Sequence, residues 1–142
     1  MDLIKKIVAG HATLATLHGE VKALCSESGS AQCHGCPRAR VCDGEIDRFL
    51  ARLLDAATEQ VRVESALIKI HQANSAHQAA LAEHARCHDK LINDLGSYIM
   101  NFGRVPTASL VHATSTLLQH WLEDHIPQHD GLLFDIAHAT TT

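Results

Sequence analysis

The chain has 142 residues, and its 12 Lys and Arg against 16 Asp and Glu give a net charge of −4 with neutral histidine. This charge, together with an aromatic content of only 4%, argues against a nucleic-acid binder, which needs a basic surface and stacking rings. No apolar run approaches the roughly 20 residues of a membrane span, and no secretory signal begins the chain, so we expect a cytoplasmic protein that does not bind membranes.

Apolar residues recur at the spacing of amphipathic helices along most of the chain. We expect four helices, over residues 2–25, 43–73, 76–101 and from 107 onward. Asp43 and Thr107 are the expected N-caps of the second and fourth helices, and no segment alternates long enough to predict a strand. The pattern predicts an all-α, antiparallel, up-and-down four-helix bundle, with residues 1–142 as one domain and a Cys-rich loop at about 25–42.

The chain carries 12 histidines and 5 cysteines, and several histidines fall on the apolar helix faces. His84 and His88 are four residues apart, so both imidazoles point in one direction, as a helical two-histidine metal site requires. The polar residues that we expect on inward faces are His11, Gln60, Glu64, His77, His84, His88 and His125. Burying unpartnered polar groups costs roughly 1–3 kcal/mol each, so a metal ion in the bundle core explains them best.

The segment 121–130 resembles the last-helix signature of hemerythrins: a Trp-Leu pair, then His125-Ile126, then Asp130 five residues after the histidine. The spacing of His84 and His88 is similar to the paired histidines of that family's third helix. The resemblance implies that His84, His88 and His125 bind one iron ion, that His11 binds a second, and that Glu64 and Asp130 bridge the two.

The chain departs from the hemerythrin pattern at Gln60, where the family has a histidine four residues before the bridging glutamate. An amide oxygen is a poorer iron ligand than an imidazole nitrogen. His77 lies two helical turns before His84 on the same predicted face, and it is the alternative candidate for the missing ligand. The sequence leaves the choice between Gln60 and His77 open.

A separate cluster of cysteines, Cys25, Cys33, Cys36 and Cys42, has the spacing C-x7-C-x2-C-x5-C. In a cytosolic protein such spacing favours metal binding over disulfides. It is similar, apart from one extra residue in the first gap, to the [4Fe-4S] loop of DNA-repair glycosylases, and it resembles part of the cysteine pattern of oxygen-sensing iron–sulfur regulators. A [4Fe-4S] cluster, a structural zinc ion and redox-active or idle thiols remain the three interpretations.

The hemerythrin resemblance implies a non-haem iron protein that binds or senses O2 or another small redox ligand such as nitric oxide or peroxide. A signal would then pass to a signalling protein partner or through a homo-oligomer. One alternative is a small iron oxidoreductase acting on peroxide or nitric oxide. Another is an electron-transfer module whose working centre is an iron–sulfur cluster in the Cys-rich loop.

Overall fold

The computed structural model describes residues 2–24, 39–73 and 76–139. These form α1 (Leu3–Leu24), α2 (Ala39–Gln72), α3 (Gln78–Met100), α4 (Thr107–His120), η1 (Trp121–Asp130) and α5 (Gly131–Ala139). The described ranges contain no strand, so the predicted all-α fold class is confirmed. Within those same ranges, no helix is both long and apolar enough to cross a bilayer.

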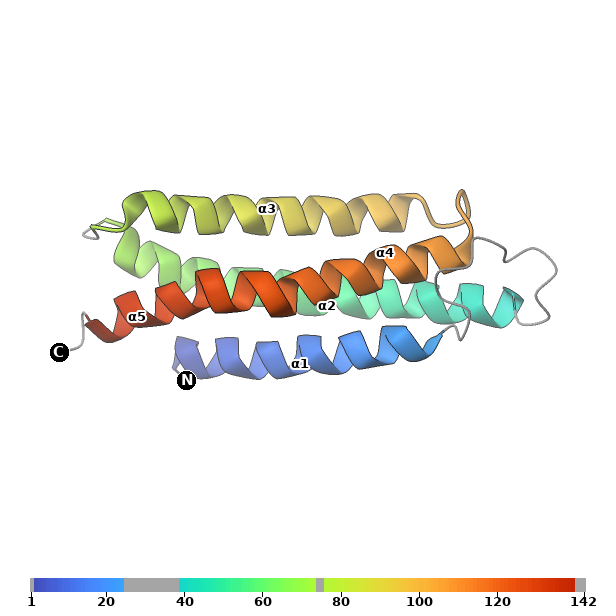
Figure 1. The fold of residues 1–142 in the computed structure, drawn as a ribbon, viewed down its shortest axis with the longest axis horizontal. Coiled ribbons are helices and arrows are strands. Elements are labelled where there is room, and N and C mark those ends of the chain that lie inside the picture. Colours follow the sequence, from blue (N-terminus) through green and yellow to red (C-terminus); the bar gives the residue numbers. More distant parts are fainter. Residues whose placement is uncertain (1, 25–38, 74–75, 140–142) are drawn as a thin grey trace.

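The helices are packed lengthwise. α4, η1 and α5 follow one another without interruption and form one continuous rod, which lies alongside α1, α2 and α3 (Figure 1). Helix α1 packs against α2 and α4, and α2 also packs against α3. The beginning of α1 and the end of α5 lie toward the same end of the molecule (Figure 1).

The apolar core is divided into two clusters that follow one another along the helices. The first includes Leu14 of α1, Ala57 of α2, Leu95 of α3 and Trp121 of η1. The second includes Ile7, Leu67, Leu81 and Leu133. On the helices, the stretch between the two clusters carries the polar residues that the sequence predicts on inward faces, except His77. The fold therefore gathers a polar layer between two apolar clusters.

The π-helix η1 was not foreseen from the sequence. A π-helix bonds residue i to residue i+5 and so includes about one more residue in each turn than an α-helix does. At its end the Gly131 N–H donates to the Ile126 carbonyl, five residues earlier. Pro127 lies inside η1, and its missing N–H removes one of the bonds that would otherwise favour regular α-helical winding.

Two helix starts differ from the predictions. Helix α2 begins at Ala39 rather than after Asp43, because Ala39 and Arg40 are good helix formers that extend it. The last residues of the predicted Cys-rich loop are therefore helical. Thr107 is the first residue of α4 rather than its cap, since Pro106 occupies the N-cap position and no side chain caps the helix.

Candidate metal centre

Five polar side chains meet in the layer between the two apolar clusters. Helix α2 provides Glu64, α3 provides His84 and His88, and η1 provides His125 and Asp130. All five are at most 6% exposed, and Glu64 and Asp130 are fully buried. One ligand atom from each lies within 4.8 Å of all the others. The structure thus brings together five of the predicted metal-binding residues.

The three imidazoles converge on one carboxylate oxygen. Glu64 Oε1 lies 3.0 Å from the Nε2 atoms of both His84 and His88, and 3.6 Å from that of His125. The second carboxylate completes the group, with Asp130 Oδ1 at 3.0 Å from His84 Nε2 and 3.3 Å from His125 Nε2. The Nε2 atoms of His88 and His125 are 3.2 Å apart.

Hydrogen bonding alone does not account for this arrangement. Asp130 Oδ1 accepts no hydrogen bond from any described residue, although two ring nitrogens lie close to it. Metal–ligand bonds of about 2.1 Å would place neighbouring ligand atoms about 3.0–3.4 Å apart around one ion. The separations given above, 3.0–3.6 Å, are near this spacing, so the five side chains could hold one metal ion.

The π-helix explains how two residues five apart both reach the centre. In an α-helix, His125 and Asp130 would point about 140° apart around the axis. The wider turn of η1 reduces that angle, and both side chains are buried in the same layer. His84 and His88 need no such distortion, because four residues span about one turn of α3.

Burial and neighbouring charges shift the pKa values of His125 and Glu64 in opposite directions. Burial works to lower the pKa of His125, but the neighbouring carboxylates of Asp130 and Glu64 outweigh it and raise the pKa to about 9. Burial works to raise the pKa of Glu64, yet His125, His84 and His88 hold it far below its usual range. A cation arriving at neutral pH must therefore displace a proton from His125, and protons compete with it increasingly as the pH falls.

Gln60 and His11 lie beside this group and contact the other oxygen of each carboxylate. The Gln60 Nε2 donates to Glu64 Oε2 at 2.8 Å and to the Ile7 carbonyl at 3.1 Å. His11 Nε2 lies 2.6 Å from Asp130 Oδ2, and the His11 side chain is 17% exposed. The structure brings both predicted residues to the centre. His11 does not belong to the five-ligand group (Glu64, His84, His88, His125 and Asp130), and Gln60 directs its amide nitrogen, a hydrogen-bond donor, at Glu64.

The other predicted ligands lie elsewhere. His77 is exposed at the N-cap of α3 and does not belong to the five-ligand group. Cys42 lies in α2, and nothing is described of its side chain. Cys25, Cys33 and Cys36 fall outside the described residues, so the iron–sulfur and zinc interpretations of the cysteine cluster stay predictions.

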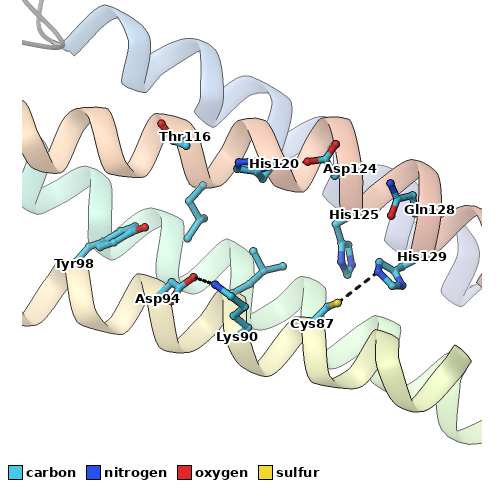
Figure 2. Close-up of a pocket in the computed structure, with 12 residues that line it drawn as sticks. Cys87, Lys90, Asp94, Tyr98, Thr116, His120, Asp124, His125, Gln128 and His129 are labelled. Atoms are coloured by element: carbon cyan, nitrogen blue, oxygen red, sulfur yellow. Dashed lines mark hydrogen bonds and ion pairs between the residues drawn. The ribbon is translucent and has the colours of Figure 1, made fainter. Parts of the chain in front are cut away.

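A cavity of about 390 Å³ reaches this centre from the side (Figure 2). It lies between α3 and the α4–η1 rod, and His125 lines it together with His129 and Cys87. Figure 2 shows Cys87 and His129 pointing toward each other, with Sγ and Nε2 3.5 Å apart. Burial, followed by the positive charge of His125 and His84, lowers the pKa of His129, so this imidazole is neutral at neutral pH.

Cys87 and His129 were not among the predicted site residues. The signal for His129 is its position four residues after His125, which in an ordinary α-helix would favour it over Asp130. The signal for Cys87 is its position three residues after His84. With His125 they form a second, partly exposed group whose ligand atoms also lie within 4.8 Å of one another.

No protein-family model matches this sequence, and searches of curated proteins and of solved structures found no match. The chemistry of the centre therefore has to be inferred from its own donor atoms.

Proposed function

We propose that this chain is a hemerythrin-like, non-haem iron protein that binds or senses O2 or another small redox ligand within an antiparallel, up-and-down four-helix bundle. The observation that supports it most is the convergence of three imidazoles and two carboxylates, all buried, at mutual distances suited to one ion. Buried charges of this kind persist in proteins when they are paired or bind a metal.

The donor set favours iron over zinc. Structural zinc is nearly always four-coordinate, whereas this group offers five donor atoms. A mixture of imidazole and carboxylate suits iron, and an ion with six positions would keep one open for an exogenous ligand. Such an ion supplies redox chemistry and a binding position, while the protein's own residues hold it in an apolar surrounding.

The cavity beside His125 gives a small ligand a path to the centre. Its lining includes the exposed side chains of Lys90 and Asp124, so it reaches the surface, and it also includes the buried His125 (Figure 2). His129 lies in the same wall, where its neutral imidazole can donate a hydrogen bond to a ligand or accept one. We expect the residues that line the cavity to orient the ligand and to limit its size.

The size of this cavity favours the oxidoreductase as a second candidate. A volume of about 390 Å³ exceeds what a diatomic ligand needs and falls within the range of small-molecule sites. Repeated turnover of peroxide or nitric oxide with an added reductant would support the enzyme. A stable spectrum after a single stoichiometric addition of ligand would support binding or sensing.

The direct test is the iron content of His125→Ala beside that of the matched control His120→Ala. His120 lies on the same rod, but it is exposed and its Nδ1 bonds to Asp124. We expect His125→Ala to lose most of its core iron and the His120→Ala variant to retain it. Unchanged iron in His125→Ala, measured in a background with the four clustered cysteines replaced by serine, would contradict the assignment.

A further inference from the structure

We infer that the core centre holds one metal ion, because Gln60 and His11 occupy by hydrogen bonding the side of the carboxylates that a second ion would need. The inference rests on the proposed function, since it concerns the same site. It departs from the two-iron arrangement that the hemerythrin resemblance implies. Two observations carry it: the orientation of the Gln60 amide and the pairing of His11 with Asp130.

The orientation of the Gln60 amide is fixed by its partners. Both the Ile7 carbonyl and Glu64 Oε2 are acceptors, so the amide must present its NH2 group to them. The amide oxygen instead lies against the backbone of α1, where a Cβ on Gly10 would overlap it. An ion at Glu64 Oε2 would therefore meet N–H donors rather than a ligand oxygen.

The second carboxylate is engaged in the same way. Asp130 Oδ2 is bonded to His11 Nε2 at 2.6 Å, while Oδ1 faces the three-histidine group. Each acid thus directs one oxygen to the five-ligand group and the other to a side-chain partner. A second ion would have to break both of these hydrogen bonds, and among the described residues in contact with these two oxygens, His11 would offer it a ring nitrogen.

A single ion changes what the centre can do. One ferrous ion gives up one electron in becoming ferric, so reducing O2 to peroxide, which takes two electrons, needs a further electron from an external reductant. The ligands that match a single reduced ion are therefore neutral diatomic molecules that it binds without net reduction, or substrates of one-electron steps.

The test is an anaerobic titration with ferrous iron, followed by oxidation and electron paramagnetic resonance. The titration uses a variant in which the clustered cysteines cannot bind iron. It carries the substitutions Cys25→Ser, Cys33→Ser, Cys36→Ser and Cys42→Ser. We expect saturation at one iron per chain and an uncoupled high-spin ferric signal that accounts for all of it. Two irons per chain in a coupled, resonance-silent pair would overturn the inference but not the proposed function; no bound iron would overturn both.

Two substitutions at Gln60 test whether this residue keeps a second iron ion out of the centre. In the same background, Gln60→His replaces the amide donor by a possible ligand, and we expect uptake to rise toward two irons with loss of the uncoupled signal. Gln60→Leu offers no ligand, and we expect it to stay at one iron. A Gln60→His variant that stays at one iron, or a Gln60→Leu variant that takes up two, would overturn the assigned role of Gln60.

Discussion

Glu64 and Asp130 each divide their two oxygens between the histidine group and a neighbouring side chain. On Glu64 that neighbour is Gln60, and on Asp130 it is His11. Interactions of this kind orient ligands, and their loss typically costs 10–100-fold in metal affinity. The geometry of the centre therefore depends on residues that do not themselves belong to the five-ligand group.

The substitution Gly10→Ala adds one methyl group beside Gln60 and tests whether the centre depends on the position of that side chain. In Gly10→Ala the new methyl group displaces the Gln60 amide, which then loses its bonds to Glu64 and Ile7. Leaving a buried polar group unsatisfied costs about 1–3 kcal/mol. We expect this cost to outweigh the gain in helix propensity of up to about 1 kcal/mol, so that the free energy of unfolding falls. Thermal or urea unfolding measures it.

The matched control is Gly19→Ala on the same helix, where a Cβ meets nothing within 4 Å. There the substitution removes only the poor helix propensity of glycine, so we expect stabilisation by up to about 1 kcal/mol. Equal effects of the two substitutions would show that Gly10 is not needed for the packing of Gln60.

At the level of elements, the π-helix η1 places two side chains of the continuous α4–η1–α5 rod in the candidate metal centre. It brings His125 and Asp130 into one layer although they are five residues apart. Because π-helical segments are rare and frequently lie at functional sites, η1 is a second, independent indication that this part of the chain is functional.

Replacing Pro127 tests whether η1 is needed. The Pro127→Ala variant regains a backbone N–H and favours regular α-helical winding, which would turn Asp130 away from His125. We expect iron affinity to fall at least about 10-fold, as for other changes that disturb ligand orientation, while the metal-free protein becomes no less stable. Calorimetric titration with ferrous iron measures the affinity.

Exposed Gln128 in the same helix is the control, since Gln128→Ala leaves the backbone bonding of η1 unchanged. Iron affinity in Pro127→Ala equal to that of the Gln128→Ala control would contradict a role for the π-helix in placing Asp130.

The helices themselves follow from the sequence because their signal is local. Leu14, Leu17 and Val21 recur at helical spacing and are all buried in the first apolar cluster. The pairing of His84 with His88 on one face of α3 also follows from their spacing alone. The all-α fold and much of the ligand group were therefore within reach of sequence analysis.

The features that the sequence does not predict depend on contacts between elements. The amide of Gln60 is oriented by the Ile7 carbonyl on another helix, which no pattern within α2 reveals. His125 and Asp130 share a face only because η1 departs from α-helical winding. Cys87 and His129 are adjacent only once α3 and η1 are packed together.

At the scale of the whole molecule, the polar layer interrupts the apolar core. Three imidazoles and two acids separate the apolar clusters, and the described residues satisfy only part of their bonding capacity. A bound ion links α2, α3 and η1 and stabilises the folded chain by mass action, by about 4 kcal/mol at 1,000 times its dissociation constant.

We therefore expect chelation to lower the melting temperature of the bundle and restored ferrous iron to recover it. The size of this shift should grow with the concentration of free iron, as linkage requires. His125→Ala should melt at the same temperature with and without iron. A metal-independent melting temperature in the wild-type chain would show that the ion does not join the helices.

The central claim is that buried imidazoles and carboxylates, rather than thiolates, hold the iron. The most direct measurement is X-ray absorption at the iron edge on the full chain loaded with iron. We predict a shell of five or six nitrogen and oxygen neighbours at about 2.1 Å, with the outer-shell scattering of three imidazoles and no sulfur. A first shell of sulfur without imidazole scattering would contradict the account and move the iron to the cysteines.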